Sequence, residues 1–268
     1  MMTFGTIGAF GFDDFDPPEV IGLYAGAGCT VVQAYRNRAR DIPAERIVSV
    51  CDDLGMTIDS LHAHFGDDLD PSSEDEQVRR FAVETYRQEA EYCRRLGGRI
   101  SVIHPSPPHA SAGDLARRHS QLRRSMEELA RIGEEMDAVY AFENMPAYHP
   151  TGADVGRLVE MVAGVGSEQV IFLLDFGHAH MTCGIGEAIA LAGGHLKYTH
   201  VHDNDGVNDT HGLPYRGSLP WDRCREGLHK IGYDGVFLLE VFEQSAELRR
   251  LLSAEWRARI QTILNNGK

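Results

Sequence analysis

The chain has 268 residues, of which 43% are hydrophobic and 25% charged, a composition that supplies a core and argues against intrinsic disorder. The net charge of −14 weighs against non-specific binding to nucleic acid, which depends on Lys and Arg. No run of about 18 apolar residues occurs, and nothing basic precedes Arg36, so we expect neither a membrane partner nor a signal peptide. Five dispersed cysteines without a CxxC pair predict a reduced, cytoplasmic protein.

Short apolar runs that favour strands alternate with amphipathic segments along the whole chain. The predicted strands are 3–10, 30–36, 57–64, 99–105, 138–145, 170–178, 197–203 and 235–242. The clearest predicted helices are 74–96, 114–136 and 245–265. Eight strand–helix units of about 33 residues predict an α/β fold, the (β/α)8 TIM barrel, as a single domain over residues 1–268. A doubly wound open sheet is the alternative, but no glycine-rich phosphate turn follows the first strand.

Polar side chains gather where the later predicted strands end, which is where a TIM barrel places its active site. These residues are His62 and His64, His104, Glu143 and Asn144, Asp175 and His178, His200, His202 and Asp203, and Glu240. Glu143 and Glu240 lie in apolar runs, and a buried carboxylate needs a cation or several hydrogen-bond donors. A divalent metal meets this need for both, and carboxylate with imidazole donors favours Zn or Mn.

Simpler interpretations exist for single residues. A lone carboxylate at a strand end is more often the N-cap of the next helix, so the metal hypothesis depends on the joint pattern over strands four to eight. Two histidines in proline-rich loops, His109 and His149, are interpreted as incidental. His119, His195 and His229 lie on or near predicted helices and are interpreted as surface or packing residues.

Taken together, the motifs of this sequence resemble the xylose-isomerase-like TIM barrels, a superfamily of sugar-phosphate isomerases and epimerases that also holds endonuclease IV. The motifs are "VIHP" (102–105), "FEN" (142–144), "LLDFGHA" (173–179), "THVHDNDGVNDTH" (199–211), "GSLPW" (217–221) and "LLEVF" (238–242). The resemblance implies the metal quartet of the epimerases at Glu143, Asp175, His200 and Glu240. It also implies that His178 contacts substrate beside the metal.

Endonuclease IV-like proteins use more ligands, arranged around three zinc ions. The resemblance places those additional ligands at His62, His104, Asp209 and His211, and His178 completes the set. One to three ions, of Zn or Mn, are therefore expected. His62 is preferred over His64 because it matches the "LHA" pattern of the family.

The resemblance implies an isomerase, namely a metal-dependent isomerase or epimerase of a sugar, sugar phosphate or keto-polyol that works through an enediolate. Glu143 and Glu240 are expected to move the proton, and His178 to orient the carbonyl oxygen. Further substrate contacts are expected from His202, Asp203, Arg216 and Trp221. The alternatives are support of neighbouring ligands for His202 and Asp203, an exposed loop position for Arg216 and core packing for Trp221. A homo-oligomer is also expected.

The alternative function is an endonuclease IV-like phosphodiesterase acting on abasic DNA. The number of available ligands favours this alternative. The arginines of "YRNRARD" (35–41) would then reach the nucleic acid, or they bind a sugar phosphate, or they pair with surface acids. The acidic net charge weighs against a nucleic-acid partner.

Overall fold

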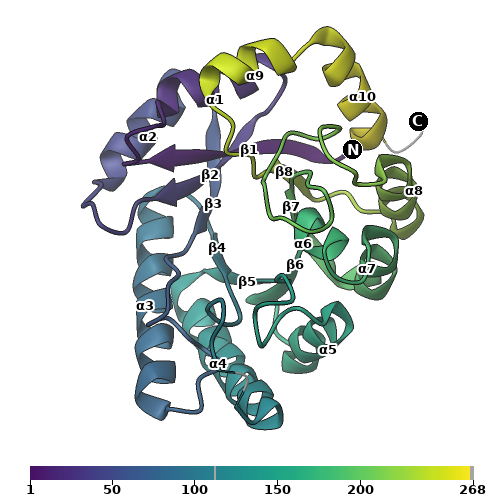
Figure 1. The fold of residues 1–268 in the computed structure, drawn as a ribbon. Helices are drawn as coiled ribbons and strands as arrows, with labels where there is room; N and C mark the ends of the chain where they lie inside the picture. Colours follow the sequence, from purple (N-terminus) through teal and green to yellow (C-terminus); the bar gives the residue numbers. More distant parts are fainter. Residues whose placement is uncertain (112, 266–268) are drawn as a thin grey trace.

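Eight parallel strands close into a barrel in the computed structural model, which describes residues 1–111 and 113–265 (Figure 1). The strands are β1 (Thr3–Phe10), β2 (Val31–Arg36), β3 (Thr57–His62), β4 (Ile100–Ile103), β5 (Val139–Glu143), β6 (Val170–Asp175), β7 (Leu196–Val201) and β8 (Val236–Leu239). Each strand pairs with its neighbours in chain order, and β8 pairs with β1, so the sheet has no free edge. The predicted (β/α)8 barrel is confirmed.

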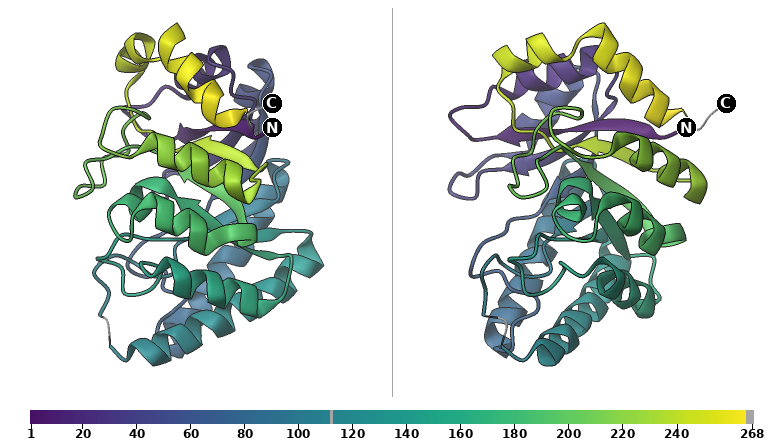
Figure 2. Two further views of the ribbon diagram at one scale, coloured as in Figure 1. Left: turned by 90° about the vertical axis from the view of Figure 1, so that its right-hand side faces the viewer. Right: turned by 45° about the vertical axis from the view of Figure 1, so that its right-hand side comes forward.

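Helices surround the barrel in all three ribbon views (Figure 1, Figure 2). They are α1 (Pro17–Gly26), α2 (Ala44–Asp53), α3 (Glu76–Arg95), α4 (Leu115–Met136), α5 (Val155–Val165), α6 (Phe176–His180), α7 (Ile185–Ala192), the 3-10 helix η1 (Gly193–His195), α8 (Trp221–Ile231), α9 (Ser245–Leu251) and α10 (Ala254–Leu264). Aspartates cap several N-termini; Asp75, for example, accepts a hydrogen bond from the backbone N–H of Gln77. Within the described ranges, no helix combines the length and apolar character needed to cross a bilayer.

Most predicted strands extend past their observed ends, and two differences have a clear local cause. The predicted strand 170–178 ends at Asp175, because its carboxylate accepts the backbone N–H of His178 at 2.6 Å and so caps α6. The predicted helix 245–265 is two helices, because the side chain of Ser253 accepts the backbone N–H of Trp256 and starts α10.

The barrel interior is built in layers, and this layering places the polar residues. One layer consists of Ile7, Val102, Ala141, Leu173, Tyr198 and Leu238. Side chains alternate between the two faces of a strand, so a residue two positions later points inward one layer higher. For five of these strands that residue is His104, Glu143, Asp175, His200 or Glu240. The two-residue alternation of side chains along each strand therefore places these polar side chains in the mouth of the barrel.

The two ends of the described chain meet at the other end of the barrel, where the strands begin (Figure 2). The backbone N–H of Met2 donates to the carbonyl of Leu264 at 3.4 Å. This contact packs α10 beside the start of β1 and leaves the loops that follow the strands to shape the mouth.

Candidate metal centre

The predicted quartet meets at the top of the barrel. Glu143, Asp175, His200 and Glu240 are all buried, and each offers a donor atom that lies within 4.8 Å of the other three. Nδ1 of His200 lies 3.1 Å from Oε1 of Glu143 and 3.1 Å from Oε2 of Glu240. Four strands, β5 to β8, thus contribute one ligand-type side chain each to one small volume, from the last two residues of the strand or the residue directly after it.

Several carboxylate oxygens in this group accept no hydrogen bond from the described residues, since Nδ1 of His200 makes its hydrogen bond with Oε1 of Glu143. They are Oε2 of Glu143, Oδ2 of Asp175 and Oε2 of Glu240, and all three are buried. An unpaired buried carboxylate oxygen is costly, and a divalent cation removes that cost for the whole group at once. Three carboxylates and an imidazole form a donor set that suits Zn or Mn. The residues therefore fit a divalent metal.

Within the protein, protonated histidine supplies the positive charge that these carboxylates require. Burial raises the pKa of Glu143, but His200 and then His104 outweigh it and hold that pKa well below its usual range. Burial also raises the pKa of Glu240, and His200 again outweighs it. Burial lowers the pKa of His200, yet Glu240 and Glu143 raise it well above its usual range. A cation and this proton therefore compete for the same carboxylates.

A second group of ligand-type side chains consists of His62, His104 and Glu143. Nε2 of His104 lies 3.4 Å from Oε2 of Glu143, and Nε2 of His62 lies 3.8 Å from the same oxygen. Nδ1 of His62 donates to the carbonyl of Ala63 at 2.9 Å, which leaves Nε2 for a metal. In His64, the competing candidate, Nε2 instead lies 3.8 Å from Oε1 of Glu89.

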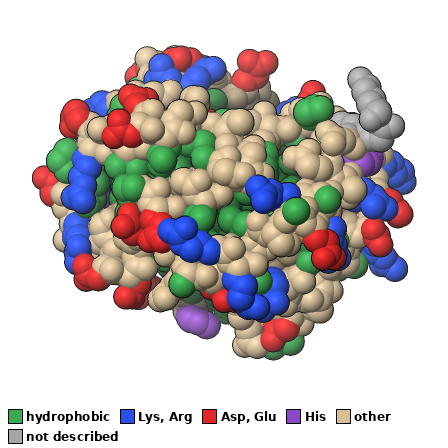
Figure 3. Space-filling view, turned by 90° about the horizontal axis from the view of Figure 1, so that it is seen from above, with side chains coloured by type: hydrophobic (Ala, Val, Ile, Leu, Met, Phe, Trp, Pro, Cys, Tyr) green, Lys and Arg blue, Asp and Glu red, His purple; other side chains and the backbone are tan. Residues whose placement is uncertain are grey.

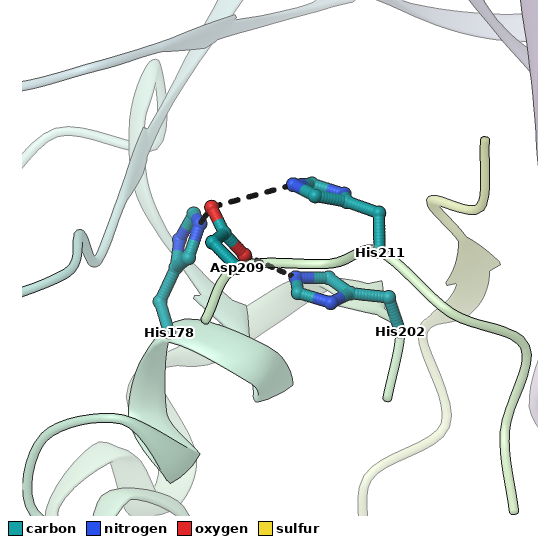
Figure 4. A group of neighbouring side chains, drawn as sticks. All are labelled: His178, His202, Asp209 and His211. Carbon is teal, nitrogen blue, oxygen red and sulfur yellow. Dashed lines mark hydrogen bonds and ion pairs between the residues drawn. The ribbon is translucent and has the colours of Figure 1, made fainter. Parts of the chain in front are cut away.

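The third group consists of His178, His202, Asp209 and His211, and its imidazoles converge on the carboxylate (Figure 4). The Nε2 atoms of His178, His202 and His211 lie 3.1, 3.6 and 3.4 Å from the oxygens of Asp209. Two of these rings donate Nδ1–H to a backbone carbonyl, His178 to Asn144 at 2.8 Å and His211 to Glu240 at 3.1 Å. Metal-binding imidazoles are commonly oriented in this way.

The third group differs from the expectation in one residue. His202, expected to contact substrate, is fully buried, and its Nε2 also lies 3.1 Å from Oδ1 of Asp175.

The other two histidines of the third group have raised pKa values. Burial lowers the pKa of His178, but Asp175 and Asp209 outweigh it and raise that pKa to about 10. The pKa of His211 is raised to about 9, because Asp209 and Glu240 outweigh burial.

Three other expected substrate contacts do not reach the cavity. The buried carboxylate of Asp203 accepts Nε1–H of Trp221 at 2.8 Å and the backbone N–H of Leu219 at 3.1 Å. These hydrogen bonds hold the loop before α8 in place. The polar atoms of the Asp203 and Trp221 side chains are therefore already bonded within the protein. Arg216 is exposed and outside the cavity lining. The neighbouring Gly217 packs so closely that a Cβ there would lie 2.2 Å from the carbonyl oxygen of Asn204.

A cavity of about 210 Å³ lies over the ligand groups. Glu143, His178 and Glu240 contribute to its lining, and no described Lys or Arg does. Its aromatic lining residues are Tyr35, Phe65, Tyr148 and Phe242. The cavity therefore presents carboxylates and imidazoles on one side and apolar rings on the other.

The arginines at the end of β2 and in the loop after it are paired with acids. The pairs are Arg36–Glu89 at 2.6 Å, Arg38–Asp68 at 2.6 Å and Arg40–Asp13 at 2.7 Å. Of the three interpretations of this segment, the structure supports pairing with acids, of which Asp68 and Asp13 lie at the surface and Glu89 is buried. On the face that Figure 3 shows, basic and acidic side chains also alternate without a basic patch.

Sequence reasoning missed one histidine of the cavity. His149, interpreted as incidental, is buried and lines the cavity beside Glu143 and His178. Burial and then His104 lower the pKa of His149 to about 4, so its imidazole is neutral at pH 7. It lies in a loop, where no period marks the side that faces the barrel axis. A histidine six residues after Glu143 was the signal available.

Comparison with known proteins gives relatives with named activities. Residues 21–261 match the family described as xylose isomerase-like TIM barrel. An uncharacterized protein of Methanocaldococcus jannaschii is 30% identical over 186 residues, 67% of this chain and 63% of that protein. A D-psicose 3-epimerase of Enterocloster bolteae is 30% identical over 132 residues, 48% of this chain and 41% of that enzyme. The chain thus spans less than two thirds of either relative.

Solved structures share the fold over nearly the whole chain. A D-tagatose 3-epimerase-like protein has a TM-score of 0.77 at 22% identity, with 98% of both chains covered. The D-psicose 3-epimerase of Clostridium cellulolyticum H10 has a TM-score of 0.77 at 19% identity, covering 98% of this chain and 100% of that one. With a closed eight-stranded barrel and a match over residues 21–261, this protein belongs to the xylose isomerase-like TIM barrel family.

Proposed function

We propose that this protein is a divalent-metal-dependent isomerase that epimerises or isomerises a small sugar by proton transfer through an enediolate. The observation that carries the proposal is the placement of Glu143 and Glu240, both 3.1 Å from Nδ1 of His200 and both lining one cavity. The relatives named as sugar 3-epimerases support the reaction class.

Each residue of the quartet has a role in this proposal. A divalent metal held by Glu143, Asp175, His200 and Glu240 would supply a Lewis acid for the substrate carbonyl. Glu143 is the last residue of β5 and Glu240 comes directly after β8, so their carboxylates approach a bound sugar from different sides of the barrel. One withdraws the proton beside the carbonyl, and one returns it. His178, fixed by its bond to the Asn144 carbonyl, orients the carbonyl oxygen.

We propose an uncharged substrate, a free ketose or keto-polyol. The cavity of about 210 Å³ is lined by Glu143, Asp209 and Glu240 but by no described Lys or Arg. A phosphate or carboxylate on the substrate would meet no Lys or Arg in this lining, and the imidazoles of His178 and His211 are already paired with Asp209. The arginines after β2 already have acidic partners.

We propose that the second and third groups bind further ions of Zn or Mn, which gives up to three. Glu143 belongs to two groups, and its two oxygens face different imidazoles, His200 and His104. Bridging carboxylates are common where metal sites adjoin. The orphaned Oδ1 of Asp209 and the oriented rings of His178 and His211 support an ion in the third group.

The phosphodiesterase alternative is not favoured. The three ligand groups are the single observation on its side, because multi-metal sites serve phosphate chemistry well. No described Lys or Arg lines the cavity, and these are the side chains on which binding of a DNA backbone mainly depends. Incubating the metal-loaded protein with a duplex that contains an abasic site separates the two functions, and we expect no cleavage.

The proposed function is tested by isotope exchange in Glu143→Gln and Glu240→Gln. Metal-loaded protein is incubated in deuterated water with D-psicose, D-tagatose, D-fructose and L-ribulose. The wild type should epimerise or isomerise at least one ketose and incorporate deuterium, and each variant should lose at least about 100-fold in rate with its fold intact. His119→Asn on the outer helix α4 is the control and should retain full activity. Unchanged exchange in both glutamine variants contradicts the proposal.

We further propose that residues 1–268 act as one domain in the cytoplasm, as a homo-oligomer with a small-molecule partner. The five cysteines are unpaired, which suits a reducing compartment. Light scattering of the purified protein tests the oligomer.

A further inference from the structure

His149 is a cavity histidine that the proposed reaction does not yet use. It lies in the loop between β5 and α5, six residues after Glu143. Its side chain is buried, yet it lines the cavity together with His104 and His178. It belongs to none of the three ligand groups found among the described residues.

One ring nitrogen of His149 is committed to the protein. Nδ1 lies 2.7 Å from the carbonyl oxygen of Ser106. A carbonyl oxygen only accepts hydrogen bonds, so Nδ1 carries the hydrogen and Nε2 keeps its lone pair. Within residues 1–111 and 113–265, Nε2 has no partner. The imidazole therefore presents a hydrogen-bond acceptor to the cavity.

The ring is held rigidly by the loops that follow β4 and β5. The backbone N–H of Thr151 donates to Oγ of Ser106 at 3.3 Å, and Oγ of Ser106 donates to the Thr151 carbonyl at 3.2 Å. Oγ1 of Thr151 also donates to the carbonyl of Pro105 at 2.9 Å. These bonds tie the two loops together around His149, and a group fixed in this way binds a ligand without a large ordering cost.

The position of His149 suits contact with a ligand that extends from the metal centre. Its ring centroid lies 6.0 Å from that of His104, and the two rings are nearly perpendicular. The ring centroid of Tyr148 lies 5.2 Å from that of His149, and Met145 and Pro108 line the same cavity. A hydrogen bond made in a largely apolar site is stronger than one in water, and a buried polar group left without a partner is costly.

We propose that His149 is a substrate-binding residue whose Nε2 accepts a hydrogen bond from one hydroxyl of the sugar. This inference rests on the proposed sugar isomerase function. His149 thereby makes the enzyme selective for ketoses that carry a hydroxyl at that position, in addition to the oxygens handled at the metal quartet.

The test uses His149→Asn, because an asparagine amide N–H can still donate to the Ser106 carbonyl while nothing replaces Nε2. Turnover is measured for the best of D-psicose, D-tagatose, D-fructose and L-ribulose, and for its monodeoxy derivatives. The variant should lose about tenfold in kcat/KM with the parent ketose. For one monodeoxy ketose, the variant and the wild type should be equal, because the partner hydroxyl is already missing.

Several outcomes overturn the proposal. An equal loss of kcat/KM for the parent ketose and every monodeoxy ketose indicates that His149 has a structural role. An unchanged kcat/KM for the parent ketose shows that His149 does not contact it. A lower metal content by elemental analysis in His149→Asn makes the residue a metal ligand instead. His119→Asn should match the wild type throughout. If the wild type turns over no ketose and binds none by calorimetry, the proposed function and this inference both fail, whereas failure of the variant pattern alone leaves the function standing.

Discussion

The Oε1 atom of Glu143 lies 3.1 Å from Nδ1 of His200, although 57 positions separate the two residues in the sequence. The other oxygen of the same carboxylate faces His104 at 3.4 Å. One side chain thus joins two groups of ligands, so the charge at one group affects the other.

Asp209→Asn should lower the metal content of the protein by one ion per chain. Asp209 is the only carboxylate of the third group, and an amide is a poor replacement for it as a ligand. Elemental analysis after dialysis in metal-free buffer measures the change. Asp205→Asn in the same loop is the control, because in the described part of the chain the Asp205 carboxylate accepts hydrogen bonds from Val207 and Asn208, which lie outside the third group. An equal ion count in wild type and Asp209→Asn removes the third site.

Gly177→Ala should lower the free energy of unfolding by about 1–3 kcal/mol. A Cβ at this position would lie 1.9 Å from Cε1 of His202, so the buried imidazole must move away from Asp175. Urea denaturation measures the loss. Gly22→Ala in α1 is the control, since its Cβ meets only Leu54 at an ordinary 3.6 Å. That variant should be unchanged or up to about 1 kcal/mol more stable through helix propensity. Equal effects at the two glycines contradict the close packing of His202.

Asp203→Asn should destabilise the protein by about 1–3 kcal/mol without changing KM. Its carboxylate accepts hydrogen bonds from Trp221 and Leu219, and an amide replaces one of the two acceptors with a donor. Thermal unfolding and steady-state kinetics together separate the roles. A raised KM at unchanged stability supports the sequence-based interpretation that Asp203 contacts substrate.

Asp59 should make the protein less stable as the pH rises from 5 to 7.5. Burial raises the pKa of Asp59 to about 6 in the folded protein, against about 3.9 when unfolded. Folding thus favours the neutral acid. The stability that the protonated Asp59 contributes to the folded protein is fully present below about pH 4 and is lost as the pH rises through about 6. Between pH 5 and 7.5 the loss is about 1 kcal/mol.

The measurement for Asp59 is the free energy of unfolding at both pH values. Asp59→Asn should show a fall smaller by about 1 kcal/mol than the wild type. Asp53→Asn, which changes an exposed carboxylate at the end of α2, should follow the wild type. An identical pH dependence in Asp59→Asn and wild type contradicts the raised pKa. Tyr198 and Ser60 each donate to one oxygen of Asp59, so Asp59→Asn loses one of these hydrogen bonds at both pH values, and the pH dependence is the quantity compared.

The sequence by itself determined the barrel and the composition of its mouth. Strand alternation has a period of two, so the apolar layer that includes Ala141, Tyr198 and Leu238 already placed Glu143, His200 and Glu240 inward. That information is local, because each strand carries its own period whatever its neighbours are. The predicted strand ends were less accurate, since the residues that leave the sheet remain buried and extended.

Only the tertiary structure decided which polar side chains belong together. His202 joins Asp209 and His211, Asp203 bonds to Trp221, and His149 turns toward the cavity. All of these residues lie beyond the regular part of a strand, where no period fixes the direction of a side chain. Their contacts arise between loops of different strands, which meet only because the barrel closes, so the physical information that selects them is not local in the sequence.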